Sequence, residues 1–128
     1  MVDASAAVDL VLRLPAGRRL EPVLCDPDAD LHSPAVCDVE VGAALRRRIL
    51  RRTISPAVGA AALRDHRDLP ITRYPHRRLL LPAFELRDNF AFADALYVVL
   101  AEALQAVLVT GDRRLARAAR GIGLEVAT

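Results

Sequence analysis

Short apolar segments that alternate with helical segments are the feature that most constrains the fold of this chain. Strand-like segments are expected at Met1–Val2, Leu69–Tyr74, Val107–Val109 and Leu124–Val126, and helical segments separate them. Strands that are separated by helices pair in parallel, because the connecting helix crosses over a face of the sheet. The pattern therefore predicts an α/β fold, a three-layer α/β/α sandwich with a small central parallel sheet.

Start and stop residues and the apolar pattern together delimit the helical segments. Ser33–Pro34 and Ser55–Pro56 each have the character of a helix cap followed by Pro in the first turn. Pro15–Gly17 is expected to end the first helix. Phe90–Gln105 is apolar almost throughout, which predicts a helix that is buried on most sides. Helices are expected at residues 6–14, 18–25, 33–52, 56–67, 75–87, 90–105 and 113–120.

The 128 residues contain no internal repeat, low-complexity tract or linker. This length, with an apolar content of about half, suits one compact core, so residues 1–128 are expected to form a single domain. No apolar run reaches the roughly 18 to 20 residues of a membrane span, and the first residues lack the order of a signal peptide. These observations predict a cytoplasmic protein.

The cysteines and histidines offer no zinc site. Cys25 and Cys37 are too far apart in the sequence for a CxxC motif, and we expect both to be reduced, packed thiols. His32, His66 and His76 are scattered, and we expect each at the surface or in a loop.

Every one of the 18 basic residues is Arg, and the chain contains no Lys. This composition excludes a P-loop, which requires the sequence GxxxxGK[ST]. It also argues against receiver domains and haloacid-dehalogenase-type phosphatases, which place a Lys against the phosphoryl group. The net charge of +2 is too small to indicate nucleic-acid binding by itself, so the distribution of the arginines matters more than their number.

Four acids attract attention by their positions. Asp3 and Asp112 each follow a predicted strand, and ligands of parallel α/β sheets bind outside the carboxyl ends of the strands. Asp94 lies in the first turn of the apolar helix, and Glu40 lies early in the third predicted helix. Each acid also has a structural interpretation: Asp112 as a helix N-cap, Asp94 as a dipole partner, Asp3 as a turn residue and Glu40 as a solvated position.

A metal ion would account for a buried cluster of these acids. An ionised carboxylate in apolar surroundings is costly unless it is paired or binds a metal, and no Arg lies within one helical turn of Asp94. Hard oxygen ligands select Mg²⁺ or Mn²⁺, which can activate water and stabilise the oxyanion that leaves a phosphodiester. The predicted metal ligands are Asp3, Glu40, Asp94 and Asp112.

Three segments at these acids resemble the PIN-domain family, specifically the VapC toxins of bacteria. Val2–Ala6 is similar to the family's first strand with its catalytic Asp, and Asp94–Tyr97 to its DALY-type helix. Val109–Leu115 is similar to its TxD segment, and the stretch around Glu40 resembles the region of its second acid.

The resemblance implies a metal-dependent endoribonuclease that uses Mg²⁺, with Mn²⁺ as the alternative metal. It further implies RNA substrates from the translation apparatus, of the tRNA or ribosomal RNA class, and neutralisation by a cognate VapB-type antitoxin. The catalytic residues that it implies are Asp3, Glu40, Asp94 and Asp112.

Two departures from the family leave a second interpretation open. Relatives often carry Ser or Thr where this chain has Ala91, and an aromatic residue where it has Ala93, although Asn89 remains as a polar supporter. The alternative is a catalytically weakened PIN-like module that binds RNA or a protein partner without cleavage. Asp88 lies close to Asp94 in the sequence, but we expect it to cap the apolar helix instead.

A helical face connects Glu40 with arginines. Steps of four, three and four residues lead from Glu40 through Ala44 to Arg47 and Arg51, so their side chains share one face. Guanidinium groups there would suit an RNA backbone, while the alternative is a solvated charged face. The predicted RNA-binding residues are Arg47, Arg51 and Arg113. Apolar residues on several helix faces also predict a homodimer and a groove for an antitoxin helix.

Overall fold

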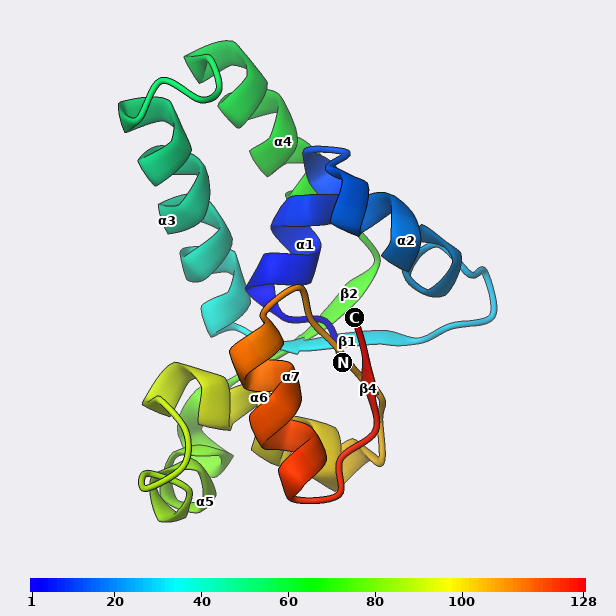
Figure 1. Ribbon diagram of the computed structural model, residues 1–128, viewed down its shortest axis with the longest axis vertical. Helices are drawn as coiled ribbons and strands as arrows, with labels where there is room; N and C mark the ends of the chain where they lie inside the picture. The colour runs from blue at the N-terminus through cyan, green and yellow to red at the C-terminus, as the bar shows by residue number, and fades with distance from the viewer.

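The computed structural model describes residues 1–128 and has the predicted three-layer arrangement (Figure 1). The strands are β1 (Leu31–Pro34), β2 (Ile71–Tyr74), β3 (Leu108–Val109) and β4 (Val126–Ala127). The helices are α1 (Ala4–Val11), α2 (Pro15–Leu24), α3 (Val36–Leu50), α4 (Pro56–Asp68), α5 (Leu80–Glu85), α6 (Phe92–Leu104) and α7 (Arg113–Gly121), with a short 3-10 helix, η1 (His76–Arg78). In Figure 1, α1 to α4 lie on one side of the strands and α5 to α7 on the other.

The sheet consists of two parallel pairs, β1 with β2 and β3 with β4, which the start of the chain joins. Val2 forms a parallel bridge with Val109, and its amide donates to the carbonyl of His32 in β1 at 2.9 Å. The spatial order is therefore β2, β1, residues 1–3, β3, β4. Because residues 1–3 and β3 run in parallel, Asp3 and Asp112 follow them toward the same edge of the sheet.

The apolar segment before the third strand forms the central helix, as predicted. Six residues of α6 are buried, and it packs against both β1 and β3. On the other face, Ala6 and Ala7 of α1 are fully buried, so their small side chains let this helix lie close to the sheet. No helix combines the length and the apolar character needed to cross a membrane.

The predicted cap at Ser33–Pro34 is wrong. Both residues belong to β1, which pairs with β2 from Leu31–Ile71 to Pro34–Tyr74. The Ser33 hydroxyl donates to the carbonyl of Val2 at 2.9 Å inside the core, so it cannot cap a helix. The next helix begins at Val36, whose amide donates instead to Nε2 of His76 at 2.8 Å.

Two prolines explain further differences at the helix boundaries. Pro15 begins α2 at its first position rather than ending the first helix, and α1 stops at Val11. The predicted helix over 75–87 is split because Pro82 has no N–H to donate to the carbonyl of Arg78. The chain therefore forms η1 and restarts as α5, where Pro82 lies in the first turn and needs no such donor.

Several side-chain predictions also need correction. Cys25 is exposed and only Cys37 is buried. His66 is not at the surface: it is 2% exposed, and its Nε2 lies 2.7 Å from Oδ1 of Asp38. Asp88 does not cap α6, because the N-cap residue is Ala91 and no side chain bonds to that helix end.

Candidate active site

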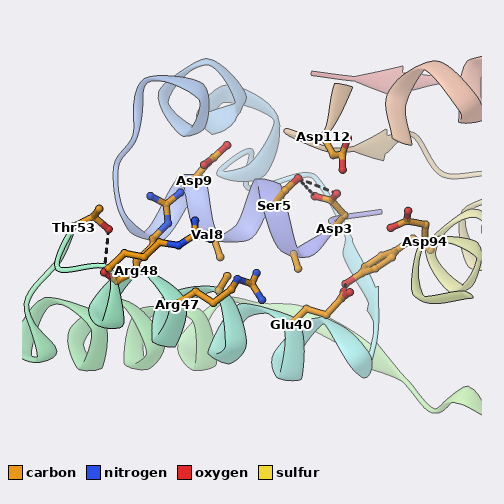
Figure 2. A pocket seen from close by; sticks show the side chains of 14 residues that line it. Asp3, Ser5, Val8, Asp9, Glu40, Arg47, Arg48, Thr53, Asp94 and Asp112 are labelled. Carbon is orange, nitrogen blue, oxygen red and sulfur yellow. Dashed lines mark hydrogen bonds between the residues drawn. The ribbon is translucent and has the colours of Figure 1, made fainter. Parts of the chain in front are cut away.

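A pocket of about 510 Å³ contains all four of the acids singled out in the sequence (Figure 2). Its volume falls within the range of small-molecule binding sites. Figure 2 shows acidic side chains at one end of the pocket and arginines of α3 toward the other. The lining residues are Asp3, Ala4, Ser5, Val8, Asp9, Glu40, Ala44, Arg47, Arg48, Arg51, Thr53, Asp94, Tyr97 and Asp112.

Asp3 is the most deeply buried of the acids and the N-cap of α1. Its Oδ1 accepts from the amide of Ala6 and from the hydroxyl of Ser5, both at 2.8 Å, and its Oδ2 accepts from Oγ1 of Thr110. Burial raises the pKa of the Asp3 carboxyl to about 6, although these hydrogen bonds oppose the shift. The charge of Asp112 raises this pKa further.

Asp112 is the N-cap of α7, and its Oδ1 accepts from the amides of Arg114 and Leu115. The loop before it is tied to Asp3: the amide of Asp112 donates to Oγ1 of Thr110, which itself donates to Asp3. The structural interpretation of Asp112 as an N-cap is thus accurate, and Asp3, for which the structural alternative was a turn residue, is an N-cap as well. They do not exclude a second role, because both carboxylates also line the pocket.

Asp94 is half-buried in the first turn of α6. Burial raises the pKa of its carboxyl above the usual value, and the charges of Asp112 and Glu40 raise it further. The basic residue that pairs with Asp94 is Arg114 of α7, whose Nη2 lies 3.9 Å from Oδ2 of Asp94. Because Arg114 is 82% exposed, this ion pair stabilises the charge only weakly.

Glu40 reaches the pocket from α3 and is held by a residue of α6. The phenol of Tyr97 donates to its Oε2 at 2.6 Å, and the Tyr97 side chain is almost completely buried. Burial raises the pKa of this phenol, so it remains a donor throughout the neutral range. Glu40 is therefore not the freely solvated helix position that was the structural alternative.

The donor chemistry of this pocket fits a divalent cation that keeps part of its water shell. No group of three or more His, Cys, Asp or Glu side chains is close enough together to bind one ion directly. Mg²⁺ in proteins is commonly held by one or two carboxylates and several waters. The charges of Asp112 and Glu40 raise the pKa of Asp94, so both carboxylates lie within interaction range of Asp94.

The opposite end of the pocket carries positive charge. All four residues of the predicted α3 face line the pocket: Glu40, Ala44, Arg47 and Arg51. Arg113 lies outside it, exposed beside a separate shallow recess of α7. The arrangement therefore offers hard anionic ligands next to cationic groups that suit phosphate.

Sequence reasoning missed several pocket residues. Asp9, Arg48 and Thr53 also line the arginine end, and Ser5 and Thr110 hold Asp3 in place. A signal existed for the last two, because each is a hydroxyl residue within two positions of a selected acid. Asn89, expected to support the site, is exposed and does not line the pocket.

Comparison with known proteins gives consistent results for sequence and fold. The PIN domain family model matches residues 1–121. Ribonuclease VapC12 of Mycobacterium tuberculosis is 40% identical over 121 residues, 91% of this chain and 89% of the relative. Ribonuclease VapC1 of the same organism is 42% identical over 130 residues, 98% and 94% of the two chains. The crystal structure of PAE2754 from Pyrobaculum aerophilum matches with a TM-score of 0.70 at 24% identity, over 98% of this chain and 80% of that one.

Proposed function

Because this chain belongs to the PIN-domain family and, within it, to the VapC ribonucleases, we propose that it is a metal-dependent endoribonuclease with a single catalytic domain. The observation that carries the proposal is the pocket in which the four assigned carboxylates and Asp9 lie beside three arginines. The carboxylates come from positions between 3 and 112, so only the folded chain assembles them.

We assign metal binding and catalysis to Asp3, Glu40, Asp94 and Asp112. A divalent cation, Mg²⁺ or Mn²⁺, would supply positive charge that favours ionisation of the attacking water and stabilises the leaving oxygen. The hydroxyls of Ser5 and Thr110 favour the ionised form of Asp3, because they donate to its carboxylate.

The arginines of α3 would determine how an RNA backbone lies in the pocket. Arg47, Arg48 and Arg51 all line the pocket, and Figure 2 shows Arg47 and Arg48 on α3, away from Asp94 and Asp112. Their guanidinium groups would bind phosphates next to the cleaved bond, and the RNA backbone would thereby be oriented toward the carboxylates. Arg113 lies beyond the pocket and would contact only a longer RNA. The expected substrates are RNAs of the translation apparatus, of the tRNA or ribosomal RNA class, so that the protein would act in the cytoplasm.

We further propose a VapB-type antitoxin and a second copy of this chain as partners. Large apolar side chains remain exposed: Leu81 and Phe84 on α5, and Leu50 and Leu63 beside a groove between α3 and α4. Such surfaces are typical of protein contacts. The molar mass in solution, measured with and without co-expressed antitoxin, tests both partners.

An RNA cleavage assay with Asp94→Asn tests the proposed activity. The parent should cut single-stranded RNA with Mg²⁺ or Mn²⁺ and not with EDTA, whereas the variant should show only background cleavage. Asp88→Asn is the matched control, because Asp88 is exposed and does not line the pocket. It should cleave like the parent.

Thermal melting of the same proteins separates a ligand from a structural acid. In EDTA, Asp94→Asn should melt at the same or a higher temperature than the parent, because one of several neighbouring negative charges is gone. Mg²⁺ should raise the Tm of the parent and of Asp88→Asn but not of Asp94→Asn. A soluble parent that binds RNA without cutting it under any of these conditions would favour the non-cleaving module instead.

A further inference from the structure

Tyr97 of α6, the helix that also carries Asp94, bonds to Glu40 of α3 on the other side of the sheet. It lies three residues after Asp94, on the same face of α6, and its phenol donates to Oε2 of Glu40 in α3 at 2.6 Å. The residue is only 2% exposed, so the packing around α6 restricts the direction of the phenol group. Glu40 has no other hydrogen-bond partner among the side chains of the pocket.

We propose that Tyr97 is the positioning residue of this site: it holds the Glu40 carboxylate inside the pocket and leaves the second oxygen, Oε1, free for a metal ion or its waters. This inference rests on the proposed role of Glu40 as a metal ligand. A glutamate side chain has three rotatable bonds and would otherwise be spread over many conformers at the pocket wall. A hydrogen bond to an ionised acceptor is among the stronger ones and restricts that spread.

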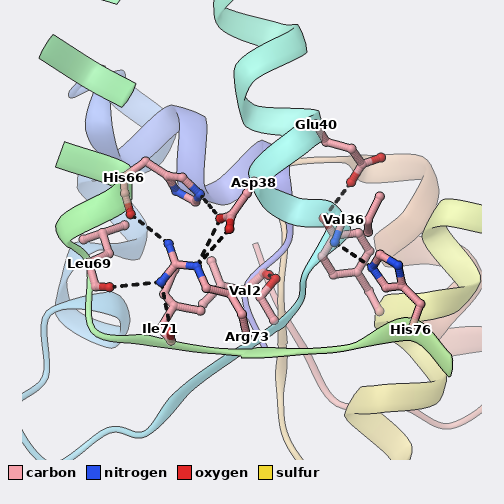
Figure 3. Close-up of polar contacts among 11 residues, drawn as sticks. Val2, Val36, Asp38, Glu40, His66, Leu69, Ile71, Arg73 and His76 are labelled. Carbon is pink, nitrogen blue, oxygen red and sulfur yellow. Dashed lines mark hydrogen bonds and ion pairs between the residues drawn. The ribbon is translucent and has the colours of Figure 1, made fainter. Parts of the chain in front are cut away.

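The start of α3 is fixed independently of Tyr97 (Figure 3). Nε2 of His76 accepts from the amide of Val36 at 2.8 Å, and this replaces the missing side-chain cap of the helix. Asp38 is bound by Nε2 of His66 at 2.7 Å and by Nε of Arg73 at 3.1 Å. Loss of the phenol should therefore release the Glu40 side chain and leave the helix backbone in place.

The Tyr97→Phe variant tests the inference, because it removes the hydroxyl and keeps the buried ring. We expect Mn²⁺ binding, measured by calorimetry on the whole chain, to weaken by about 10- to 100-fold, as for other groups that orient metal ligands. Tyr74→Phe is the matched control: it also removes a phenol hydroxyl, here one 3.1 Å from Nδ1 of His32, outside the pocket. Mn²⁺ binding of this control should equal that of the parent.

Glu40→Gln and the double variant Tyr97→Phe/Glu40→Gln identify the residue through which Tyr97 acts. If Tyr97 works through Glu40, its loss should have little further effect on Mn²⁺ binding once Glu40 is changed. An undiminished effect of Tyr97→Phe in the Glu40→Gln protein would overturn the inference. Mn²⁺ binding that is weakened by Glu40→Gln and unchanged by Tyr97→Phe would also overturn it, and would leave the proposed function intact. Full Mn²⁺ affinity in Glu40→Gln would instead contradict the proposed metal site.

Tyrosine absorbance gives a readout that does not depend on the fold of the Tyr97→Phe variant. The chain has no Trp and only two Tyr, so Tyr74→Phe leaves Tyr97 as its one strong near-ultraviolet chromophore. Mn²⁺ should shift the absorbance band of Tyr97 in this protein, because the charge of its acceptor is then shared with the cation. The shift should disappear when Glu40→Gln is added. A band that does not respond to saturating Mn²⁺ would refute the link between Tyr97, Glu40 and the metal.

Discussion

At the scale of single residues, Asp3 combines two demands that oppose each other. Asp3 is 3% exposed and its carboxylate is therefore strongly desolvated, yet it must be ionised to cap α1 with full charge and to bind a cation in the proposed function. The hydrogen bonds from Ala6, Ser5 and Thr110 recover only part of that loss, since the pKa of Asp3 stays raised, at about 6. A bound cation would supply the remaining compensation, and its absence should be visible as a dependence of stability on pH.

The Asp3→Asn variant should change this pH dependence in EDTA. The pKa of Asp3 is about 6 in the folded protein and 3.8 in the unfolded chain. Between these two pH values the native state binds more protons than the unfolded state, so stability falls as the pH rises from 3.8 to about 6. The loss is about 3 kcal/mol in the free energy of unfolding once the pH is above 6. Asn keeps an acceptor for the cap but has no proton to lose.

Urea unfolding at pH 4 and pH 7 measures the effect of this substitution. The variant and the parent should be nearly equally stable at pH 4, and the variant should be more stable at pH 7 by up to about 3 kcal/mol. The other acids titrate in both proteins, so the difference between the two proteins isolates Asp3. A variant that is less stable than the parent at both pH values would show that Asp3 is ionised at little cost.

The residue scale also shows what sequence reasoning could reach. Asp3 and Asp112 could be found because each follows a strand, and one geometric rule brings such positions to the same edge. The hydrogen bond from Tyr97 to Glu40 joins residues 57 positions apart, and the contact between Ser5 and Thr110 spans 105 positions. No local pattern encodes such pairs, because they depend on how α3, α6 and the loops are placed after folding.

At the scale of elements, helices with a sustained apolar run or a clear start were predicted well, whereas a strand that depends on tertiary pairing was missed. α6 and α4 lie close to their predicted bounds, because one has a sustained apolar run and the other a Ser-Pro start. β1 was missed because its sequence, Leu-His-Ser-Pro, has no alternating pattern, and its strand conformation arises from pairing with Val2 and β2. Tertiary contacts determine such short strands.

The corner between α1 and α2 leads to a prediction about one glycine. A Cβ at Gly17 would lie 2.1 Å from the carbonyl oxygen of Asp9, which is backbone and cannot move aside. Gly17→Ala should therefore separate the two helices and lower the free energy of unfolding by about 3 kcal/mol. Gly42→Ala is the control, because nothing lies within 4 Å of a Cβ at that position of α3. It should raise stability by about 0.5 to 1 kcal/mol, since Ala favours helix.

Chemical denaturation of the two glycine variants distinguishes close packing from helix propensity. If Gly17→Ala were as stable as the parent, the close approach of α2 to the backbone of α1 would not exist in solution. Asp9 also borders the pocket, so a separation of the helices at this corner should disturb the wall formed by Asp9 and Val8. Cleavage by the Gly17→Ala protein should decrease as well, even at temperatures where it remains folded.

At the scale of the whole molecule, the charge is nearly balanced, so long-range attraction to RNA is weak. The net charge of +2 comes from 18 arginines and 16 acids, and five of those acids line the pocket. In the proposed function, RNA would therefore be bound by a local concentration of arginines beside the acids rather than by the overall field. Arg47, Arg48 and Arg51 provide that concentration, on a wall that Glu40 shares.

The double variant Arg47→Ala/Arg51→Ala tests whether the arginines of the pocket, rather than the total charge, bind RNA. Arg77→Ala/Arg78→Ala is its control, because both of those residues are exposed on η1 and line none of the pockets described above. Each double variant removes two positive charges, so any effect of net charge is the same in both.

If Arg47 and Arg51 contact phosphates, RNA affinity should fall only in the Arg47→Ala/Arg51→Ala variant. The slope of log affinity against log salt should then decrease in magnitude by about 1.4, the value for two contacts with a single strand. Filter binding at several salt concentrations in EDTA measures this slope without cleavage. Equal slopes in the two double variants would mean that α3 presents only a solvated charged face, and the path of the RNA would have to be sought elsewhere on the molecule.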